Sequence, residues 1–155
     1  MKLTTKGRYA VTAMMDLALH ARIGRVSLAD IAERQNISLA YLEQLFRSLR
    51  KAGLVNAVRG AKGGYMLARE DKNISLADIL IASDEEINMA CGGGSGCSDS
   101  QPCLTHNLWS QLSAEFFEFL NNKKLSDLVR SRDVQTMATQ QDITVIGDIP
   151  IQLNP

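Results

Sequence analysis

The sequence has no apolar run approaching the roughly 18 consecutive residues that a membrane-spanning helix needs. Basic residues precede the first helical segment, but Asp16 and His20 interrupt it, so the apolar core and cleavage site of a secretory signal are missing. Nucleotide-binding glycine motifs and pairs of nucleophile and base are missing too. We therefore expect a cytoplasmic protein that contacts no membrane and is not an enzyme.

Cysteine is scarce and confined to one place. The chain has three cysteines, all between positions 91 and 103. An odd number argues against a closed disulfide framework, and a reducing compartment argues against it further. The thiols are therefore expected to bind metal or to sense redox state.

Net charge is also absent, because 17 basic residues balance 17 acidic ones. The charges are unevenly distributed, however. Residues 1–70 contain twelve basic and five acidic residues, whereas residues 71–155 contain five basic and twelve acidic ones. A basic half beside an acidic half indicates that the first half binds a polyanion, with chance clustering of solvated charge as the alternative.

Residues 1–70 begin with the pattern of a helix-turn-helix. An apolar helical stripe over residues 3–21 precedes a short helix that starts at Ser27 and a longer helix that starts at Ser38. The longer helix is expected to end at Gly53, because glycine adopts the left-handed conformation without strain. Such a unit places its second helix in the major groove of DNA.

Two short strand-like runs follow, at residues 54–58 and 65–68. They flank a glycine-rich turn that carries Arg59 and Lys62. A cationic hairpin directly behind a helix-turn-helix is a wing, so residues 1–70 are predicted to form a winged helix-turn-helix DNA-binding domain.

The stretch ISLADIL (74–80) nearly repeats VSLADIA (26–32). No second recognition helix or wing follows it, so we interpret it as a capped helix start and not as a repeated domain. The whole chain is predicted to be mostly α with a small β-wing. Its expected parts are the winged helix-turn-helix (1–70), a connecting helix (71–90), a ligand-binding loop (91–106), a dimerisation helix with a short following helix (104–132) and a mobile tail (133–155).

The helical pattern over residues 104–122 contains the only Trp and three of the four Phe. A single helix this aromatic cannot bury all its faces in so small a subunit. We therefore expect it to form the two-fold seam of a homodimer.

The cysteines and one histidine form the pattern C-x5-C-x5-C-x2-H, made by Cys91, Cys97, Cys103 and His106. Thiolates with imidazole suit zinc or an iron–sulfur cluster. Zinc sites usually have tighter cysteine spacings, whereas these gaps and their glycines allow the backbone to curl around a wider inorganic core. The gaps match no standard ferredoxin pattern, so the residues alone leave a cluster, zinc and metal-free thiols open.

Four stretches together resemble the IscR family of bacterial iron–sulfur cluster assembly regulators, which are dimeric winged-helix transcription factors. They are LTTKGRYAVTAM, SLAYLEQLFRSLRKAGLV, VRGAKGGYML and the cysteine–histidine loop. The likeness covers about residues 1–130, and the tail contributes nothing to it. Related regulators of nitric oxide or iron response carry three cysteines with other spacings and without this histidine.

The resemblance implies one [2Fe–2S] cluster per subunit, held by Cys91, Cys97, Cys103 and His106. It implies a homodimer that binds a pseudo-palindromic site in double-stranded DNA and receives its cluster from donor proteins of the assembly machinery. The expected output is repression or activation of cluster-assembly genes. The alternative is a winged-helix regulator with a structural zinc site.

Side chains expected at the DNA come from the N-terminus, the recognition helix and the wing: Lys6, Arg8, Tyr9, Ser38, Ala40, Tyr41, Glu43, Gln44, Arg47, Arg50, Arg59 and Lys62. Gln44 can pair with adenine and Glu43 can accept from cytosine, while the later cations suit phosphates. The resemblance implies the same use of Glu43, Gln44 and Arg59. Two alternatives remain: Glu43 as an ordinary solvated residue and Tyr41 packed against the wing.

Ala40 departs from the family pattern, since related proteins often have a serine there. An alanine offers only apolar contact, for example to a thymine methyl group. Operator preference at that position is therefore expected to differ.

Overall fold

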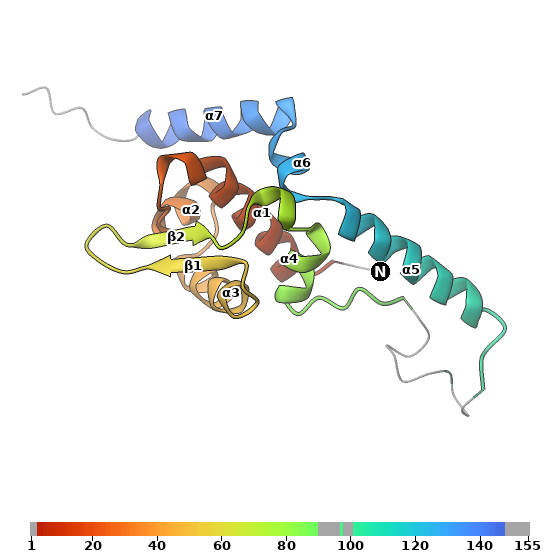
Figure 1. Ribbon diagram of the computed structural model, residues 1–155. Coiled ribbons are helices and arrows are strands. Elements are labelled where there is room, and N and C mark those ends of the chain that lie inside the picture. The colour runs from red at the N-terminus through yellow and green to blue at the C-terminus, as the bar shows by residue number, and fades with distance from the viewer. Residues whose placement is uncertain (1–2, 90–96, 98–100, 148–155) are drawn as a thin grey trace, which may run out of the picture.

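The structure is a computed structural model that describes residues 3–89, residue 97 and residues 101–147. Its elements follow in the order α1 (Thr5–His20), η1 (Ala21–Ile23), α2 (Leu28–Gln35), α3 (Leu39–Lys51), β1 (Val55–Val58), β2 (Gly64–Leu67), η2 (Asp71–Asn73), α4 (Leu76–Ala82), α5 (His106–Asn122), α6 (Leu125–Val129) and α7 (Arg132–Gly147). The described part is thus mostly helical with one small antiparallel sheet, and the predicted fold class is confirmed (Figure 1).

Capping side chains begin the helices where the sequence predicts. Ser27 accepts a hydrogen bond from the backbone N–H of Asp30, and Ser38 accepts one from that of Tyr41. Ser75 does the same for Asp78, whose carboxylate reciprocates in a complete capping box. Both copies of the repeated stretch are therefore helix starts.

The first helix is the centre of the core. Its fully buried residues Ala10, Ala13, Met14 and Leu17 pack against apolar side chains of α2 and α3. Among these partners, Ile31, Leu42, Leu45, Phe46 and Leu49 are almost completely removed from water. This burial holds the two helices of the helix-turn-helix against α1.

The two strands pair antiparallel, with Val55 opposite Leu67 and Val58 opposite Gly64. An isolated bridge joins Val26, just before α2, to Tyr65 in β2. The Tyr65 ring meets Phe46 of α3 edge-on, with ring centroids 4.8 Å apart. The wing is therefore attached to both helices of the helix-turn-helix.

A smaller apolar cluster joins α4 to the end of α5, through Ala77, Leu80 and Leu120. Beyond this contact, α5 extends away from the other helices (Figure 1). The chain then returns through α6, whose Leu125 and Val129 belong to the main core. In the described residues, no helix has the length and apolarity to cross a membrane.

The prediction of a mobile tail from residue 133 is wrong for residues 133–147, which form α7. This helix lies along α1 and α2, where Ala138 is buried with 9% of its surface exposed (Figure 1). Gln141 exchanges hydrogen bonds with Gln35 of α2. Its apolar residues follow no strong helical period, and contacts with distant polar residues hold the helix in place. Residues 148–155 lie outside the described part.

Candidate DNA-binding surface and cysteine–histidine site

The recognition helix α3 has a buried face and a solvent face. Leu42, Leu45, Phe46 and Leu49 point into the core. The residues predicted to contact DNA lie on the other face and are exposed: Ala40, Glu43, Gln44, Arg47 and Arg50. Their spacing of three and four residues makes one continuous surface along the helix.

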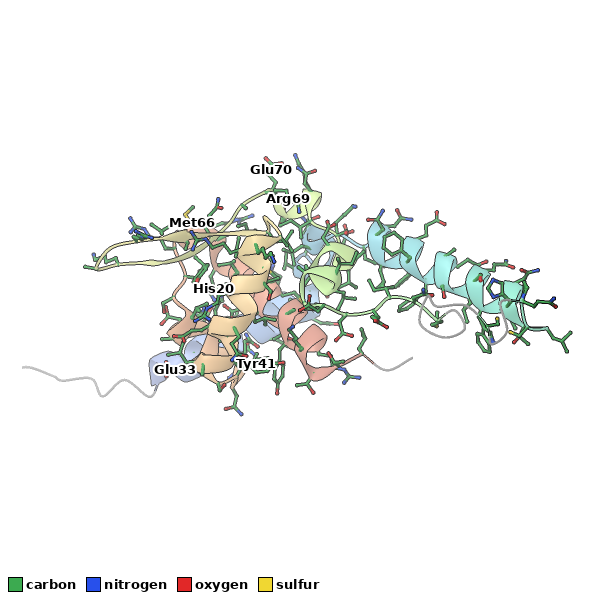
Figure 2. All side chains as sticks on the ribbon, turned by 90° about the horizontal axis from the view of Figure 1, so that it is seen from below. His20, Glu33, Tyr41, Met66, Arg69 and Glu70 are labelled. Carbon is green, nitrogen blue, oxygen red and sulfur yellow. The ribbon has the colours of Figure 1, made fainter. Side chains whose placement is uncertain are left out.

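Tyr41 lies at the beginning of the recognition helix, on the side that faces α1 (Figure 2). Its half-buried ring meets the Tyr9 ring edge-on, with centroids 5.6 Å apart and planes at 89°. The contact is thus with α1 and not with the wing. It couples the position of the recognition helix to the start of α1, and Ser38 is engaged as the helix cap.

The tip of the wing presents Arg59 and Lys62, both exposed as predicted. The backbone carbonyl of Lys62 accepts a hydrogen bond of 3.1 Å from Nη1 of Arg25. Arg25 precedes the first helix of the helix-turn-helix, and it adds a cation to the wing that sequence patterns do not reveal. Met66, on β2, is also exposed (Figure 2).

The N-terminal candidates Lys6, Arg8 and Tyr9 belong to the first turns of α1. Arg8 is exposed, but Nζ of Lys6 forms an ion pair of 2.8 Å with Oδ2 of Asp84. This partner comes from the segment after α4 and was not anticipated. Lys6 is therefore held by an acidic residue of the same chain.

Two of the four predicted metal ligands, Cys97 and His106, bring their side chains together at the beginning of α5, and the backbone of a third, Cys103, contacts them. Sγ of Cys97 lies 3.4 Å from Nδ1 of His106, and the backbone N–H of Cys103 donates to the same sulfur over 3.2 Å. Cys97 is half-buried and Cys103 is exposed. Cys91, the fourth predicted ligand, lies outside the described residues.

Sulfur and nitrogen ligands of one tetrahedral metal ion are separated by about 3.5 Å, given the usual metal–ligand bond lengths. The separation of Cys97 and His106 is close to this value. An amide N–H that donates to sulfur is also common around iron–sulfur centres. Among the residues that the structure describes, no three Asp, Glu, Cys or His side chains lie close enough together to hold a metal ion. The donor types and the Cys97–His106 pair nevertheless fit both a cluster and zinc.

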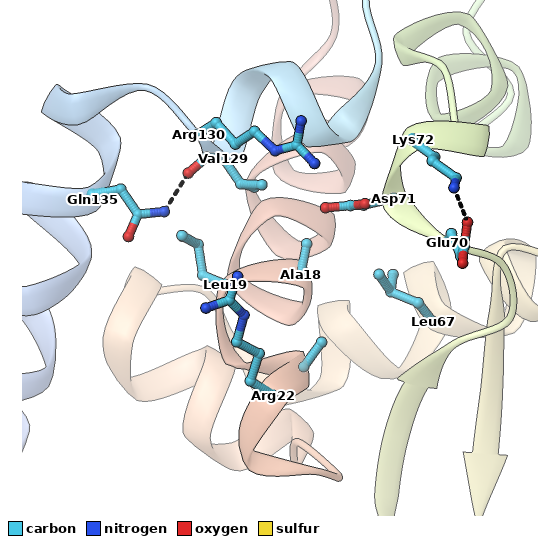
Figure 3. A pocket seen from close by; sticks show the side chains of 11 residues that line it. Ala18, Leu19, Arg22, Leu67, Glu70, Asp71, Lys72, Val129, Arg130 and Gln135 are labelled. Atoms are coloured by element: carbon cyan, nitrogen blue, oxygen red, sulfur yellow. Dashed lines mark hydrogen bonds and ion pairs between the residues drawn. The ribbon is translucent and has the colours of Figure 1, made fainter.

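A cleft of about 750 Å³ lies between the end of α1, the base of the wing and α6 (Figure 3). Leu67 and Val129 line it together with charged groups of both signs, among them Arg22, Asp71 and Arg130. None of the predicted site residues lines it. The cleft is therefore separate from both candidate sites.

A buried carboxylate connects the helices behind the DNA-binding face. Asp16, 1% exposed, accepts two hydrogen bonds from the guanidinium of Arg34, at 3.0 and 2.7 Å. Burial alone would lower the pKa of Arg34, but the hydrogen bonds and charge of Asp16 outweigh it and raise the pKa. This pair holds α2 to α1.

A winged helix with an exposed recognition helix and a cationic wing is typical of a DNA-binding regulator. The cysteine–histidine site distinguishes this protein from winged-helix regulators that have no such site. The sequence profile of the Rrf2 family, described as an iron-dependent transcriptional regulator, matches residues 3–131. The chain belongs to this family. It is a DNA-binding transcriptional regulator and not an enzyme.

Individual relatives agree with this assignment. The chain is 52% identical to the HTH-type transcriptional regulator IscR of Serratia proteamaculans, over 92% of this chain and 87% of that protein. Among solved structures it resembles IscR of T. potens, with 42% identity, a TM-score of 0.70 and coverage of 84% and 87%. It also resembles CymR, the global cysteine regulator of B. subtilis, with 36% identity, a TM-score of 0.73 and coverage of 83% and 96%.

Proposed function

We propose that this protein is an IscR-type regulator that senses cluster supply through one [2Fe–2S] cluster per subunit. Cys91, Cys97, Cys103 and His106 would hold the cluster. The observation that carries the proposal is the contact between Sγ of Cys97 and Nδ1 of His106, 3.4 Å apart at the beginning of α5. When bound, the cluster supplies a redox-active centre whose presence reports on cluster supply.

At the proposed site, some residues would bind the cluster and others position these ligands. Cys97 and His106 would supply one sulfur and one imidazole nitrogen to the cluster. The backbone N–H of Cys103 donates to the Cys97 sulfur and so fixes the position of that sulfur. Thr105 accepts from Nε1 of Trp109 over 3.1 Å, and this bond fixes the first turn of α5 that carries His106.

The proposed DNA contacts follow from the exposed face of α3. Glu43 and Gln44 would reach base edges, while Arg47 and Arg50 would bind phosphates. Arg59 and Lys62 would contact the backbone or the minor groove from the wing. Ala40 would limit recognition at its position to apolar contact with a base.

The proposed homodimer explains why α5 leaves so much apolar surface uncovered. Several large side chains on this helix are at least 40% exposed: Leu108, Trp109, Leu112, Phe117 and Phe119. A second copy of α5 would bury them and place two winged helices on a pseudo-palindromic site. Cluster donor proteins of the assembly machinery would load the site, and the output would be repression or activation of cluster-assembly genes.

The experiment that tests the cofactor is metal and acid-labile sulfide analysis of protein purified without oxygen, with a visible spectrum. The proposal predicts two irons and two sulfides per chain and charge-transfer bands. Zinc without sulfide would reject the sensing function, and a regulator with a structural zinc site would remain. The single Cys97–His106 contact fits that second candidate as well.

A further inference from the structure

The segment after α4 binds to the N-terminus of α1. The carboxylate oxygen Oε1 of Glu85 accepts hydrogen bonds from the backbone N–H groups of Thr4 and Gly7, each at 3.1 Å. It also contacts the hydroxyl group of Thr4. A carboxylate at this end of a helix satisfies free N–H groups and complements the helix dipole. Glu85 therefore acts as an anchor, from nearly 80 residues away in the sequence.

The residue at position 7 makes this contact possible. A Cβ atom added to Gly7 would lie 2.5 Å from Oε1 of Glu85 and 2.7 Å from its Cγ. A side chain at position 7 would displace the Glu85 carboxylate, so the glycine leaves room for this contact although glycine disfavours a helix. Gly7 and Glu85 thus form a matched pair.

The neighbouring residue adds a charge contact. Oδ2 of Asp84 lies 2.8 Å from Nζ of Lys6. The hydrogen bond and charge of Lys6, assisted by the charge of Lys51, lower the pKa of Asp84. Asp84 has a φ of 61°, in the left-handed region, and the chain turns there towards α1. Two consecutive acidic residues therefore hold the first turns of α1.

The far end of the segment is attached to the helix that carries His106. The backbone N–H of Met89 donates to Oγ of Ser113 in α5 over 2.8 Å. Between the two ends, Ile87 packs against the apolar cluster of α4 and α5. Cys91 follows Met89 by two residues in the sequence. The segment 84–89 therefore links the first predicted cluster ligand to the start of α1.

We infer that Glu85 is a positioning residue that couples the cluster site to the DNA-binding surface through the first turns of α1. The inference rests on the proposed function. Cluster binding at His106 would restrain α5 and with it the segment that Met89 attaches to Ser113 of α5. Because Glu85 is bound to Thr4 and Gly7, this restraint reaches α1, which carries three of the predicted DNA contacts.

The start of α1 directly contacts the recognition helix α3, so a restraint on α1 also acts on α3. Tyr9 lies two residues after Gly7 and packs edge-on against Tyr41. Lys6, held by Asp84, is the other point where the segment meets the proposed DNA surface. Without the Glu85 contact, we therefore expect the protein still to bind both the cluster and DNA. Its DNA affinity should then no longer depend on whether the cluster is bound.

The test compares Glu85→Ala with Glu86→Ala, a change at the next residue, which is exposed. The first measurement is hydrogen–deuterium exchange, in cluster-free protein, of the peptide that covers the start of α1. The second is the ratio of operator affinities of cluster-loaded and cluster-free protein, with iron and sulfide content measured in parallel. Glu85→Gln keeps an acceptor oxygen and is expected to restore part of the coupling.

We expect Glu85→Ala to exchange faster at the start of α1, to bind the cluster normally and to bring the affinity ratio to within about twofold of unity. Glu86→Ala should behave like the wild type. Unchanged exchange, cluster loss or a wild-type ratio in Glu85→Ala would each overturn the inference. If wild-type protein binds the operator equally well with and without the cluster, the proposed function is refuted and the inference with it. This measurement needs no variant, so it distinguishes failure of the proposed function from failure of the inference alone.

Discussion

Nε2 of His20, at the end of α1, lies 2.9 Å from Oδ1 of Asp142 in α7. Nδ1 of the same ring lies 2.7 Å from the backbone carbonyl of Asp16. The ring therefore has a hydrogen-bond acceptor beside each of its nitrogens. His20, buried at 7% exposure, joins α7, the last described helix, to α1.

Replacement of Asp142 by Ala should loosen α7. The Asp142 side chain is 41% exposed, so we expect a loss of about 1 kcal/mol in the free energy of unfolding and not the larger value of a buried charged pair. Denaturant unfolding measures the loss, and proteolysis within α7 should become faster. Equal stability and equal proteolysis of variant and wild type would show that the contact does not hold the helix.

Replacement of Gln44 or Arg59 by Ala should weaken specific operator binding by about 1–3 kcal/mol. Gln44 would lose a base contact on α3 and Arg59 a contact from the wing. Fluorescence anisotropy at one fixed salt concentration measures the affinity, and the visible spectrum should not change. Met66→Ala, on an exposed wing position, is the control. Unchanged affinity in Gln44→Ala and Arg59→Ala would refute these assignments.

Replacement of Leu112 by Glu should disrupt the proposed dimer. Leu112 is 41% exposed in one subunit, and burial of this remaining surface in a dimer would contribute about 1 kcal/mol per subunit. A charge there would add a desolvation cost. Sedimentation equilibrium should find monomers for this variant and dimers for the wild type. Glu118→Gln, also exposed on α5, serves as the control. A dimeric Leu112→Glu protein would place the interface elsewhere.

The ion pair of Lys6 and Asp84 should respond to acid. The folded-state pKa of Asp84 is lowered below the ordinary value of 3.8. The ion pair therefore stabilises the fold at neutral pH, and this stabilisation is lost as the pH falls through the lowered pKa. The pair is exposed, so its effect on stability is small. An NMR titration of the Asp84 carboxyl group should show a lower midpoint in the wild type than in Lys6→Ala. Equal midpoints would mean that the pair does not form in solution.

Local chemistry explains why so much of the fold could be predicted from the sequence. Ser27 and Ser38 cap helices through bonds to residues three positions on, and Gly53 ends the recognition helix with a φ of 75°. These features involve neighbouring residues only. The apolar stripe of α3 likewise separates its buried face from the face proposed to meet DNA.

The features that escaped prediction depend on contacts between distant residues. The apolar side chains of residues 132–147 follow no strong helical period, and their helix is held by His20 and Gln35, more than 100 positions away. The anchor between Glu85 and Gly7 is also invisible in the sequence, because a glycine in a helix does not reveal its partner. For the cysteine–histidine site, the ligand spacing indicated the donors, while the proximity of Cys97 and His106 came from the structure.

The most direct test of cluster sensing is the affinity of cluster-loaded and cluster-free protein for one operator, selected from random DNA with the loaded form. The account predicts at least tenfold tighter binding by the loaded protein, a coupling of about 1.4 kcal/mol. A variant with Cys91, Cys97 and Cys103 replaced by Ala should fold and bind like the cluster-free protein. Equal affinities for the loaded and cluster-free forms would contradict the account.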